Sequence, residues 1–294
     1  MGAGLLDGSA AYGDLAVNAA YALGNGLLSA IVTIGVLPFL EQLFGLITPI
    51  KLLELANPVH PLLRRLQLEA PGTYHHSIMV GNLAEAAAEA VGADALLVRV
   101  GTYYHDVGKL RRPAFFMENQ VGIENPHDRM TPSLSSLTVS AHVRDGLELA
   151  REYRLPQAVA DFIPQHHGTA LLTYFFHQAL EKGDPFDEAA FRYEGPKPQT
   201  RETAIVMLAD AVEAAVRSLN RPTPDRVDEV VRRLIREKLE DGQLDECGLT
   251  FSDLNRIAGA FVRILSGVLH PRLEYPDLER ELTRRRRDPM ARVR

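Results

Sequence analysis

The chain has a single cysteine, no tryptophan, and no lysine or arginine among its first 50 residues. One cysteine, Cys247, excludes an intrachain disulfide, a cysteine-based zinc site and an iron–sulfur cluster, and it fits a reducing compartment. The 294 residues carry 32 basic and 38 acidic side chains, for a net charge of −6. We therefore expect no binding of duplex nucleic acid, and an anionic substrate would have to meet local cations or metal ions.

Charge is also absent between Asp14 and Glu41, over 26 consecutive residues. At about 1.5 Å rise per residue, a helix of this length crosses a hydrocarbon layer about 30 Å thick. A cleaved signal peptide is a poor interpretation because no basic residue precedes the run; a buried helix of a soluble protein is the alternative. Basic residues begin at Lys51, which places the C-terminal side in the cytoplasm. We expect a transmembrane helix at about 18–40, within an N-terminal segment of residues 1–50.

The rest of the chain predicts an all-α domain. Residues 51–71 mix apolar clusters with prolines and indicate a juxtamembrane linker. Helical periodicity then dominates residues 72–275, with no alternating β-branched run. We expect roughly eight or more helices, including 93–107 closed by a left-handed Gly108, 131–152 capped by Thr131, one opening at Pro156, and 200–219, 225–239 and 252–269. Residues 276–294 form a basic tail.

Eight of the ten histidines lie between His75 and His177. Their pattern distinguishes them from isolated core histidines. It comprises the pairs His105–Asp106 and His166–His167, with His76, His142 and Asp210 on separate predicted helices. Iron, manganese and zinc bind imidazole together with carboxylate, and a carboxylate can bridge two ions. The absence of thiolates favours a hydrolytic site over a structural zinc site.

The ordered set H…HD…H…HH…D resembles the HD superfamily of metal-dependent phosphohydrolases. The strings PGTYHHSIMVGNLAEA, VGTYYHDVGKLRRPAFFMENQ, NPHD and QHHGTALLTYFFHQA resemble the cytoplasmic catalytic domain of the seven-transmembrane HD (PgpH-type) cyclic-di-AMP phosphodiesterases. The preceding apolar segment resembles the last membrane helix of that family, so the likeness runs from about Gly26 to about His270. The other membrane helices and the extracytoplasmic domain of that family are missing, and we expect either a fragment or a shortened relative.

The resemblance implies two divalent metal ions, with manganese or iron expected. It assigns one ion to His76, His105, Asp106 and Asp210, and the other to Asp106, His142, His166 and His167, with Asp106 as the bridge. A hydroxide activated by both metals would attack cyclic-di-AMP and give linear pApA. We expect Lys109 to neutralise a phosphate oxygen, and Arg111 and Arg112 to extend that positive patch toward the second phosphate. For each of these three, an ordinary surface role is the alternative.

Several histidines remain open at this point. His75 is the rival of His76, and we favour His76 because it shares a helix face with Val80 and Leu83. His127, in ENPHDRM, is a candidate for substrate contact, with a turn residue as the alternative. The remaining histidines, for which we expect structural roles, are His60, His177 and His270.

Two other functions compete with a cyclic-di-AMP phosphodiesterase at the cytoplasmic side of the cell membrane. One is a broader phosphohydrolase that acts on cyclic-di-GMP, linear dinucleotides or nucleoside phosphates. The relatives specific for cyclic-di-GMP carry a GYP tripeptide shortly after a histidine pair, whereas here the pair runs into GTALLTYFF. The other is a membrane-tethered dinucleotide receptor with a degenerate metal site, which the presence of all seven candidate ligands disfavours. The sequence indicates no oligomeric state.

Overall fold

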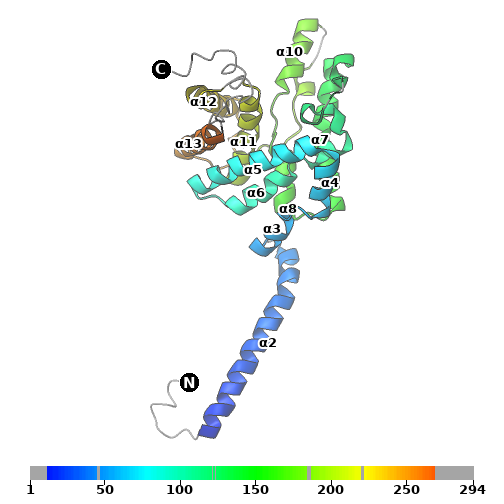
Figure 1. Ribbon diagram of the computed structural model, residues 1–294. Coiled ribbons are helices and arrows are strands. Elements are labelled where there is room, and N and C mark those ends of the chain that lie inside the picture. The colour runs from blue at the N-terminus through cyan, green and yellow to red at the C-terminus, as the bar shows by residue number, and fades with distance from the viewer. Residues whose placement is uncertain are drawn as a thin grey trace, which may run out of the picture. The chain divides into compact units, whose positions relative to one another are not determined.

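The structure, a computed structural model, describes residues 12–44, 47–120, 122, 124–183, 187–219 and 222–268 (Figure 1). Within these ranges the chain is predominantly helical. They contain no β-strand, only an isolated antiparallel bridge between Leu171 and Arg192. The all-α expectation is confirmed.

Two compact units make up the chain. Unit 1 comprises Met1–Ser77, Arg99–Pro164 and Thr173–Phe191, and unit 2 comprises Ile78–Val98, Gln165–Leu172 and Arg192–Arg294. Three helices contribute residues to both units: α5 (Pro71–Val91), α6 (Ala95–Tyr104) and α9 (Phe162–Gln165). The remaining elements of unit 1 are α2 (Tyr12–Phe44), α3 (Pro49–Leu55), α4 (Pro61–Glu69), η1 (Val107–Arg111), η2 (Pro113–Phe115), η3 (Met117–Asn119), η4 (Pro126–Arg129), α7 (Pro132–Glu152), α8 (Gln157–Ala160), α10 (Thr173–Lys182) and η5 (Glu188–Phe191). Those of unit 2 are α11 (Arg201–Arg217), α12 (Pro224–Glu240) and α13 (Phe251–Val268).

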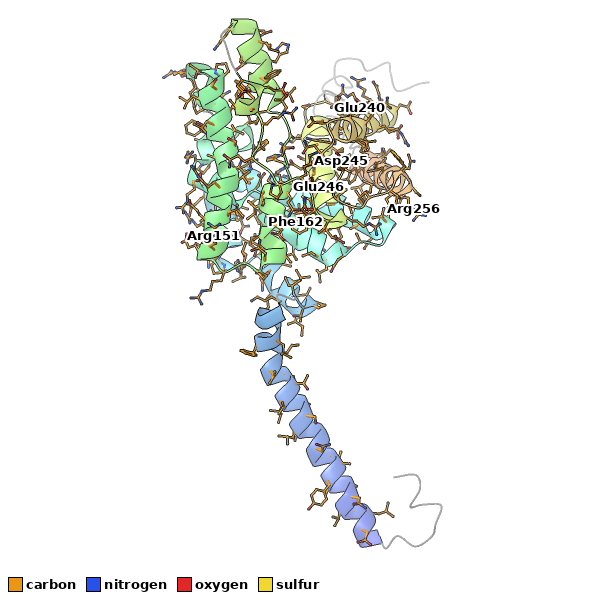
Figure 2. All side chains as sticks on the ribbon, turned by 180° about the vertical axis from the view of Figure 1, so that it is seen from behind. Arg151, Phe162, Glu240, Asp245, Glu246 and Arg256 are labelled. Carbon is orange, nitrogen blue, oxygen red and sulfur yellow. The ribbon has the colours of Figure 1, made fainter. Side chains whose placement is uncertain are left out.

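Helix α2 contains the apolar N-terminal run. Its segment Gly13–Leu37 has a mean hydropathy of 1.7, and none of it is buried. Side chains project from both sides of the helix in Figure 2. By length and composition the helix could cross a membrane. It extends beyond the expected 18–40 at both ends.

Residues 51–71, predicted as a linker, are mostly helical and packed. Thr48 caps α3 by accepting a hydrogen bond from the Lys51 backbone N–H. Leu52 and Leu55 of this helix are buried. The Tyr104 hydroxyl donates to the Leu55 carbonyl oxygen at 2.8 Å. This segment therefore forms part of the core of unit 1.

Local capping explains several helix starts. The Thr131 side chain accepts from the Leu134 N–H at the start of α7, as expected. Thr200 and Thr203 form a reciprocal capping box at the start of α11.

The predicted helix 93–107 ends earlier, at Tyr104, and a short turn leads into η1. The left-handed cap expected at Gly108 is wrong, since Gly108 lies within η1 and does not have a positive φ.

In unit 2, helices α11, α12 and α13 pack together. Helix α11 buries every residue from 203 to 209, so its exposed polar face is narrow. Asp210 follows directly and is partly exposed. The packing of α11 thus fixes the backbone that carries one of the candidate ligands.

The packing of α3 generates a prediction about truncation. A chain that lacks residues 1–46 should keep its fold, whereas loss of residues 1–60 should lower the free energy of unfolding by about 3–6 kcal/mol. Burial of a leucine contributes about 1.5–3 kcal/mol, and the longer deletion removes both Leu52 and Leu55. Urea unfolding followed by circular dichroism measures the difference. Equal stabilities of the two truncated proteins would contradict this role of α3.

Candidate metal centre

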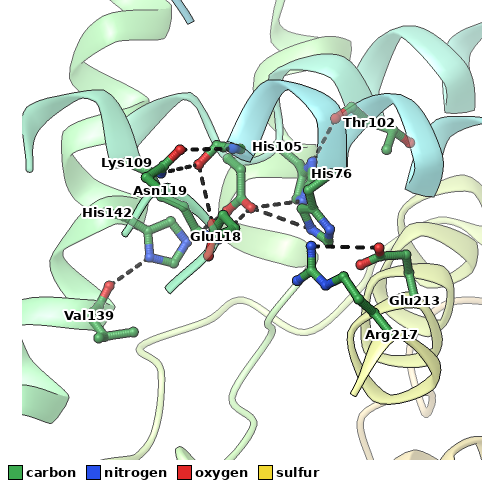
Figure 3. A network of polar contacts seen from close by, with 12 residues as sticks. His76, Thr102, His105, Lys109, Glu118, Asn119, Val139, His142, Glu213 and Arg217 are labelled. Atoms are coloured by element: carbon green, nitrogen blue, oxygen red, sulfur yellow. Dashed lines mark hydrogen bonds and ion pairs between the residues drawn. The ribbon is translucent and has the colours of Figure 1, made fainter. Parts of the chain in front are cut away.

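The buried carboxylate of Asp106 lies among three imidazoles of unit 1. These rings, His76, His105 and His142, are labelled in Figure 3. Its Oδ2 atom is 3.3 Å from His105 Nε2 and 3.7 Å from His76 Nε2. Its Oδ1 atom is 3.5 Å from His142 Nε2. The two oxygens of one carboxylate therefore face two different sets of imidazole nitrogens.

Backbone carbonyls set the tautomers of two of these rings. His105 Nδ1 lies 2.6 Å from the Thr102 carbonyl oxygen, and His142 Nδ1 lies 2.6 Å from the Val139 carbonyl oxygen. A carbonyl only accepts, so Nδ1 carries the proton in both rings. In the neutral ring Nε2 is then an acceptor that faces a carboxylate oxygen, which is another acceptor. A cation between such groups would be favoured, so this donor set fits a metal ion.

The charge state of the cluster follows from burial and from one lysine. Burial by itself raises the pKa of Asp106, but the Lys109 ammonium and His105 outweigh it and hold this pKa well below its usual value. Burial lowers the pKa of Lys109, but Asp106 and Glu118 raise it well above its usual value. Burial also lowers the pKa of His142, more than Asp106 raises it. At neutral pH the cluster thus holds a carboxylate, an ammonium and a neutral His142 imidazole.

Two glycines allow η1 to approach α7 closely enough to build this cluster. A Cβ atom on Gly108 would lie 1.8 Å from the His142 carbonyl oxygen and 2.5 Å from the Gly146 nitrogen. Gly146 lies on α7, one turn after His142. Asp106 precedes η1 with φ −109° and ψ 13°, between the helical and extended regions. Gly108 thus serves as a close-approach glycine that brings Asp106 next to His142.

Helix α5 presents the two adjacent histidines differently. His76 is buried and His75 is exposed, which agrees with the predicted helix face. A ring nitrogen of His76 lies within 4.8 Å of one of His105. His76, and not His75, is therefore the histidine of this pair whose ring nitrogen groups with His105.

Unit 2 contains the other three predicted ligands. His166 is buried, and His167 and Asp210 are partly exposed. Ring nitrogens of His166 and His167 lie within 4.8 Å of each other. The His167 ring stacks on Tyr193, with centroids 4.1 Å apart and an interplanar angle of 17°. Tyr193 thereby restrains the orientation of His167.

The residues that follow the histidine pair form a tight loop in unit 2. Gly168 has φ +55°, and a Cβ atom there would lie 2.5 Å from Gln243 Oε1. The Thr169 N–H donates to the same oxygen at 2.9 Å. Arg192 donates to the Thr169 carbonyl oxygen at 3.0 Å. The GT dipeptide after the histidine pair therefore has a conformational role.

The predicted substrate-binding residues have protein partners in unit 1. Lys109 Nζ lies 2.7 Å from Asp106 Oδ2 and 2.8 Å from Glu118 Oε1. Arg112 pairs with Asp145 at 3.1 Å. Arg111 lies 3.8 Å from an exposed Glu152. Of these three residues, Lys109 is the one that contacts Asp106.

The remaining histidines vary in their surroundings. His127 Nε2 lies 2.9 Å from the Phe115 carbonyl oxygen, and the His127 ring lies beside the rings of Phe115 and Phe175. His60 packs edge-on against Tyr104. His177 is exposed, 3.5 Å from Glu181. His270 lies outside the described residues.

Sequence reasoning assigned no role to several residues next to the candidate ligands. Glu118 and Asn119 contact Lys109 and Thr73 in unit 1. In unit 2, burial lowers the pKa of Lys238, and the charge of Asp210 partly opposes that shift. An acidic residue directly after the apolar run PAFFM was the one available signal for Glu118. No motif pointed to Lys238.

Two family models match this chain. The family model "HD domain" matches residues 73–215. The family model "7TM receptor with intracellular HD hydrolase" matches residues 2–48. The HD-domain match implies divalent metal binding, for which the imidazole and carboxylate donors around Asp106 are suited. The N-terminal match and the apolar helix α2 together indicate a membrane protein.

Relatives of named function cover most of this chain. The cyclic-di-AMP phosphodiesterase PgpH of Bacillus subtilis is 51% identical over 258 residues, which are 88% of this chain and 36% of that protein. PgpH of Listeria monocytogenes is 48% identical over 257 residues, 87% of this chain and 36% of that protein. This chain thus spans little more than a third of the length of either relative. The crystal structure of the L. monocytogenes PgpH HD domain in complex with cyclic-di-AMP aligns with a TM-score of 0.70 at 48% identity, covering 72% of this chain and 99% of that one.

The close approach of η1 to α7 generates a prediction. Gly108→Ala should lower the free energy of unfolding by about 1–3 kcal/mol or more, because the new methyl group overlaps the His142 carbonyl oxygen. The matched control is Gly259→Ala on α13, where a Cβ atom would have nothing within 4 Å. That substitution should leave stability unchanged or raise it by up to about 1 kcal/mol. Equal unfolding midpoints of the two variants would refute the role of Gly108.

Proposed function

This chain belongs to the family of HD-domain membrane proteins that includes PgpH, and on that premise we propose that it hydrolyses cyclic-di-AMP to linear pApA. The proposal places the reaction at a centre of two divalent metal ions, manganese or iron, that share the Asp106 carboxylate. It also places the catalytic domain, residues 72–275, on the cytoplasmic side of the membrane. The absence of basic residues before Lys51 supports that orientation.

The arrangement around Asp106 is the observation that carries the proposal. Oδ2 faces His105 and His76, and Oδ1 faces His142, as a bridging carboxylate requires. We propose that Asp210 of unit 2 completes the first ligand set, and that His166 and His167 of unit 2 complete the second. These donors are nitrogen and oxygen throughout, which suits borderline and hard divalent ions.

Two such ions, when bound, supply a strong nucleophile at neutral pH and positive charge beside a phosphodiester. The residues of the chain prepare the site for this chemistry. Carbonyl oxygens of Thr102 and Val139 hold the Nδ1 protons of His105 and His142, so that each Nε2 lone pair points toward Asp106. Neutral His142 keeps its lone pair at physiological pH because burial lowers its pKa.

The cationic residues supply the remaining electrostatic contribution. The Lys109 ammonium lies beside Asp106 and 5.0 Å from the centre of the Phe116 ring. In the proposed reaction Lys109 neutralises a phosphate oxygen as negative charge develops. Arg111 and Arg112 extend the positive charge toward the second phosphate. We propose His127 as a further substrate contact.

The proposal predicts the effect of removing the bridge. Asp106→Ala in the full chain should lower turnover of cyclic-di-AMP at least about 100-fold. Loss of a residue that only orients a metal ligand costs about 10- to 100-fold, and loss of the proposed bridging ligand itself should cost at least the upper end of that range. Bound metal should fall with it, while helical circular dichroism stays near that of the wild type. The matched control, Asp228→Ala, removes a surface carboxylate paired with Arg232 and should leave turnover unchanged. A folded Asp106→Ala protein with near-normal turnover would contradict the two-metal assignment.

Substrate choice is tested in the same assay. We expect kcat/KM for cyclic-di-AMP to exceed that for cyclic-di-GMP at least about tenfold, equivalent to about 1.4 kcal/mol of differential transition-state binding. Linear pApA should accumulate before AMP, because a flexible linear product lacks the preorganisation of the ring. Equal rates on both cyclic dinucleotides, or AMP as the dominant early product, would instead favour the broader phosphohydrolase.

A further inference from the structure

We propose that Glu118 is a positioning residue, which retains the Lys109 ammonium beside Asp106 and links it to the start of α5. This inference rests on the proposed function because it assigns a metal ligand role to Asp106. It concerns a carboxylate that is itself outside the proposed ligand set and follows Lys109 by nine residues. The contacts of Glu118, Asn119 and Thr73 carry the inference.

Lys109 is held between two carboxylates. Its Nζ atom lies 2.7 Å from Asp106 Oδ2 and 2.8 Å from Glu118 Oε1. The side chains of Lys109 and Glu118 are 13% and 12% exposed, so water screens the pair little. Burial alone raises the pKa of Glu118, but the Lys109 charge overcomes it and lowers this pKa below its usual value. Glu118 is thus an anion placed where a buried ammonium needs a second partner.

Glu118 is in turn anchored to the helix that carries His76. Its Oε1 atom accepts a hydrogen bond from the Thr73 hydroxyl at 3.2 Å. The next residue, Asn119, accepts from the Thr73 N–H at 3.1 Å and donates to the Thr73 hydroxyl oxygen at 2.8 Å. Thr73 lies one turn before His76 on α5, and both side chains are buried.

A glycine makes this anchoring sterically possible. A Cβ atom on Gly72 would lie 1.8 Å from the Glu118 carbonyl oxygen and 2.4 Å from its carbonyl carbon. The segment Met117–Asn119 therefore contacts the backbone of α5 directly. Glu118 thus links Lys109 to the turn of α5 that precedes His76.

The role of Glu118 follows from competition between Lys109 and a bound metal ion for one oxygen of Asp106. Asp106 Oδ2 is the atom that Lys109 contacts and also the atom that faces His76 and His105. A cation bound at this oxygen repels the ammonium. Glu118 offers that ammonium an alternative partner, so that Lys109 stays in place without occupying Asp106. Without the Glu118 charge, Lys109 would depend on Asp106 alone and compete with the metal.

The test is a double-mutant cycle in the full chain, read as Mn²⁺ affinity by competition with a chelating indicator and as kcat and KM. Glu118→Gln keeps the side-chain shape and should weaken Mn²⁺ binding about tenfold. Loss of a residue that positions a metal ligand weakens metal affinity about 10- to 100-fold, and Glu118 acts through Lys109, so we expect the lower end of that range. In a Lys109→Met background the same substitution should change Mn²⁺ affinity less than about twofold, which is the scatter expected of uncoupled sites. Glu118→Asp, which keeps the charge, should recover part of the affinity lost in Glu118→Gln.

Glu124→Gln is the matched control. It removes an exposed carboxylate of the same segment, one that pairs with Arg129. The Mn²⁺ affinity of this variant should equal that of the wild type. Equal losses from Glu118→Gln in the presence and absence of Lys109, or no loss at all, would overturn the inference. Should Glu118→Gln fail to fold, Glu118→Ala, which also removes the charge, replaces it in the cycle under the same criterion. A wild-type chain that binds Mn²⁺ but leaves cyclic-di-AMP intact would instead contradict the proposed function, and the Mn²⁺ cycle would still decide the role of Glu118.

Discussion

The cost of burying a carboxylate governs the structure around Asp106. An isolated buried charge is strongly unfavourable, so its neighbours must compensate for the water that it loses. Here an ammonium and three imidazoles surround it, and carbonyl oxygens fix the proton positions of two of the rings. The close approach of Gly108 to α7, the inward face of α5 and the contacts of Glu118 all serve this one group.

This dependence gives the cluster two properties at once. A carboxylate whose pKa is held low stays ionised and can act as a ligand, and a histidine whose pKa is lowered stays neutral and can do the same. The two shifts have different causes: the charges of Lys109 and His105 lower the pKa of Asp106 against the effect of burial, whereas burial itself lowers the pKa of His142. The arrangement therefore favours an additional positive charge at Asp106, and this links the physical chemistry of the fold to the phosphodiester chemistry proposed for it.

Features encoded locally could be predicted from the sequence, and those that depend on distant contacts could not. The all-α class, the cap at Thr131 and the inward face of His76 follow from helical periodicity and hydrogen bonds within one turn. The early end of α6 at Tyr104 was missed, because Gly108 was interpreted as a local cap rather than as a packing contact with α7. Glu118 was missed because Thr73, its partner, is 45 residues away. The roles of the candidate ligands came from family resemblance, and they remain a proposal.

Electron paramagnetic resonance of the Mn²⁺-loaded protein tests the central claim, that Asp106 bridges two ions. Two manganese ions that share one carboxylate lie close enough to couple, so the account predicts an exchange-coupled spectrum and about two ions per chain. The coupled signal should be absent when only one ion is bound. A fully loaded wild-type protein that shows only the six-line spectrum of isolated Mn²⁺ would contradict the account.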